Sequence, residues 1–175
     1  MTERTIQNAL FQDLREKGYL LCCPNYSPAG YGWECDLFAV TRSNMFVEFE
    51  IKITRSDFRA DSLKGVADFT RHQRISSDRR TKYERLTACD PAGPSRFFYV
   101  VPADMIKPEE VPNWAGLIYV HRHASIYRPL TIGTAKPAPK LHREKVADRV
   151  VQHMASVMYW RFWSIRTGQK EGVLP

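Results

Sequence analysis

The sequence predicts one α/β domain in which a mixed β-sheet of five or six strands is flanked by helices. A chain of 175 residues has the length of a single ordinary domain. Residues 3–17 carry apolar side chains at helical spacing, whereas residues 46–53 place apolar and charged side chains on opposite faces of a strand. A second amphipathic pattern near the end of the sequence predicts a helix that packs on the sheet.

The first helix should begin after Thr2, whose hydroxyl can cap it, and should end at Gly18. A short apolar run at residues 19–23 predicts the first strand. The prolines and glycines of residues 24–32 predict a loop.

Strands at residues 35–41 and 45–53 should form a hairpin through a short turn. The register that pairs Asp36 with Glu50 gathers six apolar side chains on one face, namely Cys35, Leu37, Ala39, Val47, Phe49 and Ile51. A shift of one residue would scatter them. Asp36, Glu50 and Lys52 therefore converge on the other face.

The chain after the hairpin should form a helix capped by Thr54 or Ser56 and running through Leu63. Residues 64–85 are rich in basic side chains and poor in large apolar ones. We therefore expect a basic loop that ends in a short helix and contacts a polyanion.

Apolar runs at residues 97–101 and 117–121 predict two buried strands, and residues 125–128 are a candidate edge strand. The prolines of residues 133–140 predict a linker across the surface. The closing helix should then run from about residue 143 to residue 165.

The closing helix should bury a continuous apolar stripe. The stripe comprises Ala147, Val151, Met154, Met158, Phe162 and Ile165, and is widened by Trp160 and Trp163. The predicted domain is residues 1–167, and residues 168–175 should form a flexible tail.

Composition limits the classes of protein and partner. The net charge of +7 and the pI near 9.4 favour a polyanionic partner, of which nucleic acid is the commonest. No apolar run approaches the roughly 20 residues of a membrane helix, and the polar start does not resemble a signal peptide, so a cytoplasmic location is expected. The four cysteines show no metal-binding spacing and are expected to be reduced.

The converging residues suit phosphodiester hydrolysis. Asp36, Glu50 and the carbonyl of Ile51 could hold Mg²⁺ or Mn²⁺, because such ions take hard oxygen ligands and keep several waters. Lys52, two residues along the same face, could orient the attacking water and stabilise developing negative charge.

Asp36 followed by Glu50-Ile51-Lys52 resembles the PD-(D/E)XK nuclease superfamily. The stretches at residues 36–40, 47–52 and 56–61 are similar to the MmcB-like DNA-repair nucleases and related small phage and bacterial proteins. The resemblance implies a restriction-endonuclease-like fold and Mg²⁺-dependent DNA cleavage, with Asp36 and Glu50 as metal ligands and Lys52 as the catalytic lysine. One departure is Cys35, which stands where the superfamily name has proline.

The surroundings of this site are open to more than one interpretation. Glu48 faces Phe38 and should lie behind the metal ligands or at the surface. Glu3 could reach the metal from the first helix, although an acid in a first turn often compensates the helix dipole. The residues expected to contact DNA are basic, namely Arg55, Arg59, Lys64, Arg71, Arg74, Arg79, Arg80, Lys82 and Arg85.

Competing interpretations exist for the whole protein. A strand with charges on one face is often only the solvated side of a sheet. The fold could serve as a DNA-binding or assembly module that cleaves nothing, with the carboxylates salt-bridged to Lys52 or to basic neighbours. It could also serve as a structure-selective resolvase, which would be a symmetric homodimer.

Overall fold

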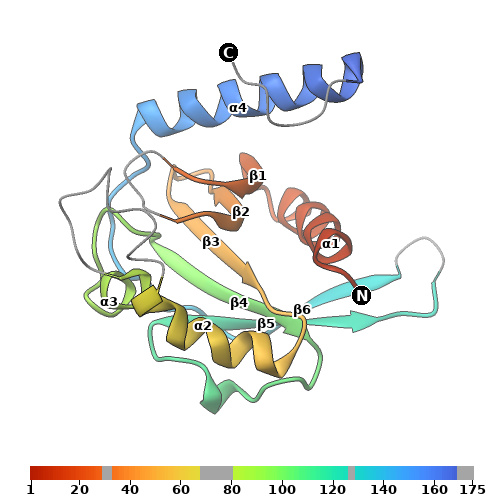
Figure 1. Cartoon of the computed structure of the whole chain (residues 1–175), viewed down its shortest axis with the longest axis vertical. Helices are drawn as coiled ribbons and strands as arrows, with labels where there is room; N and C mark the ends of the chain where they lie inside the picture. The colour runs from red at the N-terminus through yellow and green to blue at the C-terminus, as the bar shows by residue number, and fades with distance from the viewer. Residues whose placement is uncertain (29–32, 68–80, 126–128, 169–175) are drawn as a thin grey trace.

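Six strands form one mixed sheet in the order β1-β2-β3-β4-β5-β6, with helices on both faces (Figure 1). The computed structural model describes residues 1–28, 33–67, 81–125 and 129–168. The strands are β1 (Leu21–Tyr26), β2 (Cys35–Val40), β3 (Phe46–Ile51), β4 (Arg96–Pro102), β5 (Ala115–Arg122) and β6 (Leu130–Lys136). The helices are α1 (Glu3–Glu16), α2 (Arg55–Ala67), α3 (Lys82–Thr87) and α4 (Asp148–Thr167), with a 3₁₀ helix at Pro108–Glu110. The predicted single α/β domain with a mixed sheet flanked by helices is confirmed.

The sheet is antiparallel at its two edges and parallel in its centre. β1, β2 and β3 form an antiparallel meander, β3, β4 and β5 are parallel, and β6 returns antiparallel to β5. The connection from β3 to β4 contains α2 and α3, as a parallel pair requires.

The predicted register of the hairpin is confirmed from Leu37 to Val40, where β2 and β3 pair, whereas the predicted pairing of Asp36 with Glu50 lies beyond this ladder. Leu37 pairs with Phe49 and Phe38 with Glu48. One face of the hairpin therefore carries Leu37 and Phe49 and the other carries Glu48, as the alternation of a strand requires.

α1 covers the apolar face of the sheet. Its buried side chains Ile6, Leu10 and Leu14 pack against residues of β2, β3, β4 and β5. Thr2 caps the helix, since its hydroxyl accepts the N–H of Thr5. This part of the sequence analysis is confirmed.

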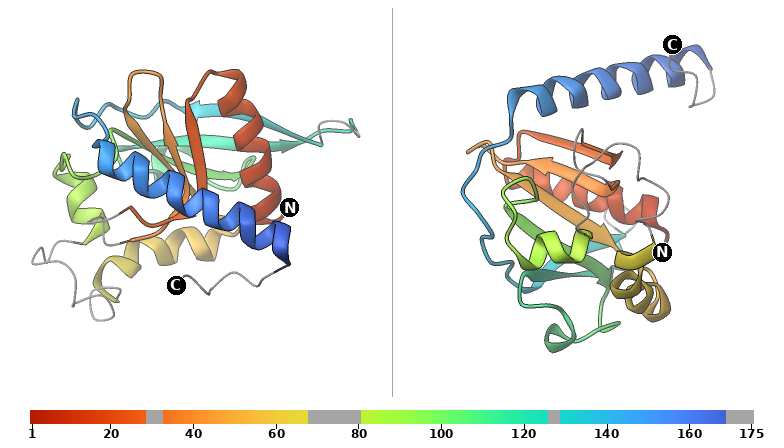
Figure 2. Two further views of the ribbon diagram at one scale, coloured as in Figure 1. Left: turned by 90° about the horizontal axis from the view of Figure 1, so that it is seen from above. Right: turned by 60° about the vertical axis from the view of Figure 1, so that its left-hand side comes forward.

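α2 and α3 lie on the opposite face, as the views in Figure 2 show. Phe58 of α2 and Leu86 of α3 join a cluster that includes Phe97 and Tyr99 of β4. Thr54 caps α2 by accepting the N–H of Asp57. The charged side chains of β3 point toward this face and are covered.

α4 crosses the β1 edge of the sheet instead of lying along its face (Figure 2). It begins at Asp148 and not near residue 143, and Met154 is its one buried residue among those that the structure describes. Phe162 is 57% exposed and Ile165 is 77% exposed. The predicted stripe is therefore wrong for the second half of the helix, which meets β1 through hydrogen bonds from Arg161 to the carbonyls of Pro24 and Asn25 and leaves these apolar side chains exposed.

Two further predictions were wrong. β1 continues through Pro24 to Tyr26, although we predicted a loop from residue 24, because an edge strand tolerates a proline. Residues 130–136 form β6, although we predicted a linker from residue 133, because Leu130 and Ile132 pack on the α1 cluster. Ser125 lies in no strand, and the rest of the predicted edge strand lies outside the described residues.

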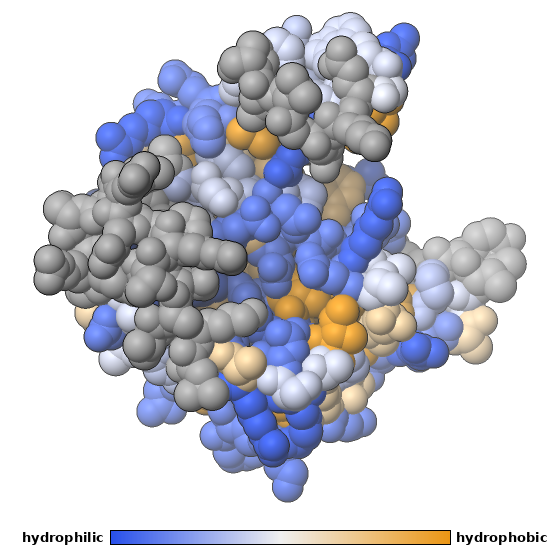
Figure 3. All heavy atoms as spheres, viewed as in Figure 1, coloured by the Kyte–Doolittle hydropathy of each residue, from blue (hydrophilic) through white to orange (hydrophobic). Residues whose placement is uncertain are grey.

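α4 ends at Gly168, which adopts a left-handed φ of 69° as a helix-terminating glycine does. The predicted tail after Gly168 lies outside the described residues. None of the helices within the described ranges is long and apolar enough to cross a membrane. The face of the molecule in Figure 3 is mostly hydrophilic, with a hydrophobic patch near its centre.

Candidate active site

The charged side chains of β3 are buried. Glu48 has no solvent exposure, Glu50 is 7% exposed and Lys52, just after the strand, is 3% exposed. Charged groups are buried at low cost only when they are paired and hydrogen-bonded. The simple solvated-face interpretation is therefore wrong, as is a surface position for Glu48.

The buried charges form a continuous chain of ion pairs. Lys52 Nζ lies 2.8 Å from Glu50 Oε1 and 2.8 Å from Asp61 Oδ1 of α2. Lys82 Nζ of α3 lies 2.6 Å from Glu50 Oε2 and 2.8 Å from Glu48 Oε1. Glu50 therefore holds one lysine on each oxygen.

Aromatic side chains bind both ends of this chain of ion pairs. Trp33 Nε1 donates to both carboxylate oxygens of Glu48 at 3.2 Å. The Tyr99 hydroxyl donates to Asp61 Oδ2 at 3.0 Å. We call the seven residues from Trp33 to Tyr99 the charge network: Trp33, Glu48, Lys82, Glu50, Lys52, Asp61 and Tyr99.

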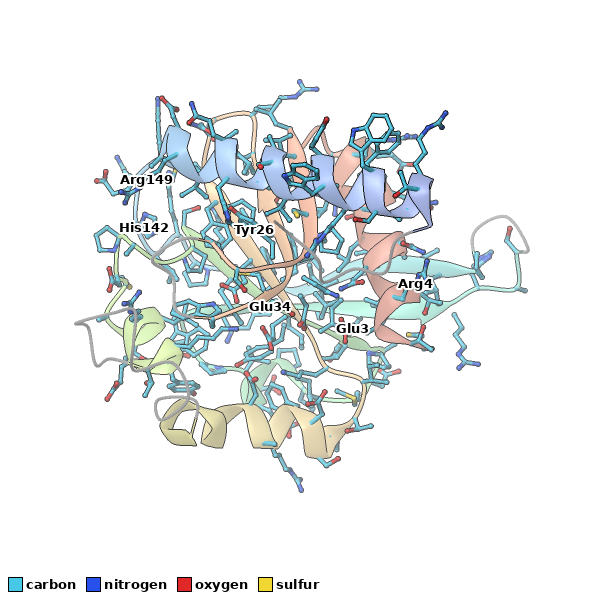
Figure 4. The ribbon with its side chains drawn as sticks, turned by 45° about the horizontal axis from the view of Figure 1, so that its top comes forward. Glu3, Arg4, Tyr26, Glu34, His142 and Arg149 are labelled. Carbon is cyan, nitrogen blue, oxygen red and sulfur yellow. The ribbon has the colours of Figure 1, made fainter. Side chains whose placement is uncertain are left out.

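Asp36 lies beside the charge network on the neighbouring strand. Its Oδ2 accepts the backbone N–H of Ile51 at 2.6 Å. Gln7 of α1 donates to the backbone carbonyl of Asp36 at 2.9 Å and to Glu3 Oε1 at 3.1 Å. Glu3 lies in the first turn of α1 (Figure 4), so this helix brings a further carboxylate toward Asp36.

The two central carboxyl groups have opposite pKa shifts. Burial and the charge of Glu50 raise the pKa of Asp36 to about 7. Burial alone would raise the pKa of Glu50, but Lys82 and Lys52 lower it to about 2. Glu50 is thus ionised near neutral pH, whereas Asp36 binds a proton far more readily than a free aspartate does.

The lysines are held in their charged form. Burial alone would lower the pKa of Lys52, but Glu50 and Asp61 raise it above its usual value. The pKa of Lys82 is raised in the same way by Glu48 and Glu50, against the effect of burial. Burial raises the pKa of Glu48 despite the nearby Lys82.

Negative charge exceeds positive charge within this group of described residues. Even with Asp36 counted as protonated, the three carboxylates of Glu48, Glu50 and Asp61 face two lysine ammoniums. Carboxylate oxygens are the ligands that Mg²⁺ and Mn²⁺ take, and a divalent cation would balance the charge. The donors therefore fit such an ion at Asp36 and Glu50, on condition that Glu50 releases an oxygen from a lysine.

The ligand set is not assembled. No group of three or more His, Cys, Asp or Glu side chains gathers around one point in the ranges that the structure describes. The expected role of the Ile51 carbonyl stays a prediction, since the observed contact of Ile51 is its N–H bond to Asp36.

The basic residues expected to contact DNA have different environments. Lys82 points inward onto Glu48 and Glu50, and Arg85 is buried, so neither is available as a surface phosphate contact in this conformation. Arg55 forms a two-pronged ion pair with Glu110, and Arg59 is exposed. The side chain of Lys64, and all of Arg71, Arg74, Arg79 and Arg80, lie outside the described residues.

Several residues of the site were not predicted. We noted Asp61 only as an acid on a helix, and the roles of Trp33, Tyr99 and Gln7 were missed. Asp61 follows Asp57 by one helical turn, and that spacing could not show which acid faces the sheet. The prediction that Cys35 packs with Leu37 was also wrong, since Cys35 packs with Cys23, Tyr26 and Phe38.

The four cysteines are free thiols, as expected. Burial raises the pKa of both Cys22 and Cys23 to about 11. They therefore lack the low pKa that marks a reactive thiol.

The fold and the buried network together define a single-domain α/β protein with a candidate site on its central sheet. No protein-family model and no curated protein matches the chain. A solved structure with a similar fold is the SPO1766 protein of unknown function from Silicibacter pomeroyi, with a TM-score of 0.62 and 19% sequence identity. The match covers 95% of this chain and 92% of that one, so the likeness extends over the whole fold.

Proposed function

We propose that the protein is a metal-dependent endonuclease that hydrolyses phosphodiester bonds in DNA. The observation that carries the proposal is the burial of Glu50 and Lys52 beside Asp36, where negative charge exceeds positive charge. Strongly perturbed, buried titratable groups are typical of functional sites. The resemblance to PD-(D/E)XK nucleases and the net charge of +7 support DNA as the substrate. The proposal includes a cytoplasmic location and a role in DNA repair, recombination or phage DNA processing.

The residues of the site would have separate roles in the reaction. Asp36 and Glu50 would hold Mg²⁺ or Mn²⁺, which polarises a phosphoryl oxygen and makes bound water a better nucleophile. Lys52 keeps its ammonium charged through Glu50 and Asp61, so it can orient water and stabilise charge that develops on the phosphate. Asp61 would position Lys52 through its ion pair, and Tyr99 would hold Asp61 through its hydrogen bond.

A cleavage panel tests this proposal. Labelled linear, nicked, flapped and four-way DNA would be incubated with Mg²⁺ or Mn²⁺ and the wild-type protein, Lys52→Met or Lys17→Met. Lys17 is a matched control, because it also pairs with a carboxylate at 2.7 Å but lies at the surface of α1. Lys52→Met should slow cleavage by at least about 100-fold and change the dissociation constant for DNA by less than about threefold.

Circular dichroism must show that Lys52→Met is folded. Absence of cleavage by the wild-type protein on every substrate would contradict the proposal. So would a folded Lys52→Met protein that cleaves as fast as Lys17→Met.

A specific contact favours a second candidate, a DNA-binding or assembly module that cleaves nothing. Both oxygens of Glu50 are engaged by lysines. In such a module the charge network would be structural and no cation would enter. Electrophoretic retardation of DNA without cleavage, unchanged by EDTA, would support this candidate over the nuclease.

A further inference from the structure

Lys82 occupies a position that suits a metal ion. Its Nζ lies 2.8 Å from Glu48 Oε1 and 2.6 Å from Glu50 Oε2, so two carboxylates on one strand converge on a single positive charge. Hard divalent cations bind carboxylate oxygens at roughly 2.0–2.6 Å. Only a small inward movement of the two carboxylates would place both within the coordination distance of an ion at this point.

The surroundings fix this position. Glu48 is fully buried, and its two oxygens share the single indole N–H of Trp33, which helps to hold the carboxylate in place. The Lys82 ammonium lies 5.0 Å from the centre of the Phe97 ring and 5.8 Å from that of Trp33, and aromatic faces attract cations. The Lys82 side chain is 21% exposed, whereas the Glu48 side chain that its ammonium contacts has no exposure.

Glu50 is common to this position and to the proposed metal site. Its Oε2 binds Lys82, and its charge raises the pKa of Asp36 on the neighbouring strand. Two-metal hydrolases place two ions about 3.5–4 Å apart, and the second ion stabilises the leaving oxygen. Glu50 would be the shared ligand of such a pair here, and the Lys82 ammonium already lies against one of its oxygens.

We propose that Lys82 is a built-in cation that fills the second cation position of this site. The site then binds one divalent ion, at Asp36 and Glu50, and the Lys82 ammonium supplies the charge that a second ion supplies elsewhere. This inference rests on the proposed function. It assigns Lys82 to the site itself and not to the phosphate-contacting surface.

Counting bound ions tests the inference. Mn²⁺ would be titrated by calorimetry into the full chain as wild type, Lys82→Ala, Lys82→Arg and the control Lys17→Ala. Wild type, Lys82→Arg and Lys17→Ala should bind one ion per chain. Lys82→Ala should bind two, because Glu48 and Glu50 then have no cation between them. Electron paramagnetic resonance should show a spin-coupled Mn²⁺ pair in Lys82→Ala alone.

A double variant keeps the inference testable if Lys82→Ala does not fold. Lys82→Ala with Glu48→Gln removes one charge of each sign, so it should fold where Lys82→Ala does not, and it should bind one ion. Equal ion counts in wild type and folded Lys82→Ala would overturn the inference. If Lys82→Ala is unfolded, two ions in either the wild type or the double variant would overturn it.

The two proposals fail separately. A wild-type protein that cleaves no DNA, together with the expected change in ion count, would reject the nuclease and retain the role of Lys82. Cleavage that requires Lys52, with an ion count that Lys82→Ala leaves unchanged, would reject only the role of Lys82.

Discussion

The centre of β3 and the second half of α4 reverse the usual distribution of side chains. On β3, Glu48 and Glu50 are buried, with Lys52 directly after them. On α4, Phe162 and Ile165 are exposed although both are strongly apolar. The charged region lies inside the protein, and the apolar region lies outside it.

The difference shows that the burial of a side chain depends on the groups it contacts and not on its polarity alone. Each charge of the β3 region has an oppositely charged partner within 3 Å, supplied by α2 or α3 or by the strand's own end. Paired charges can remain in the interior, although their desolvation is costly. The second half of α4 contacts β1 through Arg161 but leaves Phe162 and Ile165 uncovered, and exposed apolar patches of this kind are typical of contact surfaces.

Removal of Glu50 should have the largest effect on stability. Glu50→Ala leaves Lys52 and Lys82 with one carboxylate fewer between them, and loss of one partner of a buried ion pair costs about 3–5 kcal/mol. Urea denaturation measures the change. Glu110→Ala is the control, because it breaks a surface pair with Arg55 and should change stability little. Equal effects of the two substitutions would show that the β3 charges are not buried as described.

Alanine substitutions along α4 should separate its two halves. Met154 is 2% exposed, and Met154→Ala should cost about 2–5 kcal/mol through lost packing. Phe162→Ala, on the same helix, should change stability by less than about 0.5 kcal/mol. Thermal unfolding of both variants at low protein concentration provides the measurement. A large loss in Phe162→Ala would mean that the Phe162 side chain packs on the protein.

Stability should fall as pH rises through the range in which Asp36 ionises. Its pKa of about 7 exceeds the ordinary aspartate value of 3.8, so the folded state binds the proton more tightly than the unfolded state does. The protonated group therefore stabilises the fold at about pH 4, and this contribution is lost as pH rises to about 7.

Asp36→Asn should remove the loss of stability that accompanies ionisation of Asp36. The variant should be more stable than wild type at pH 8 by an amount on the order of 1–2 kcal/mol, because Asp36 is partly exposed and interacts with Glu50. Below about pH 4 the two proteins should have similar stability. Denaturation at a series of pH values is the test, and parallel curves for the two proteins would contradict it.

The smallest expected effect concerns the end of the charge network. Tyr99→Phe removes the hydrogen bond to Asp61 and should cost about 1 kcal/mol. Tyr159→Phe on α4 removes an exposed hydroxyl and should cost nothing measurable. Chemical denaturation with several replicates can resolve this difference, and an unchanged Tyr99→Phe protein would show that the Tyr99 hydroxyl does not stabilise the network.

Local patterns predicted the hairpin well and the site only in part. Alternation placed Leu37 opposite Phe49, and the confirmed register follows from the rule that strand faces alternate. The same alternation could not predict that Lys82 would cover Glu48. The two residues are 34 positions apart, and Lys82 belongs to α3 in the long connection from β3 to β4.

Other errors have equally local causes. Leu130 and Ile132 alternate with Thr131 and Gly133, a short strand signal that the nearby prolines led us to discount. Apolar periodicity in α4 predicted which residues share a face, but it contains no information on where the sheet ends. Tyr26 anchors the first half of α4 through the carbonyl of Val150 and through His153, and this contact between distant segments left no pattern in the sequence (Figure 4).

The parallel pairing of β3 with β4 has a consequence for the order of folding. β2 and β3 are joined by a short turn, so the hairpin that holds Asp36 and Glu50 closes a small loop, whereas Lys82 reaches Glu50 only after the long crossover has formed. Contacts between residues close in the sequence generally form first. We therefore expect the acidic side chains to come together while they are still hydrated. Docking of α3 should then bring Lys82 onto them and remove their water.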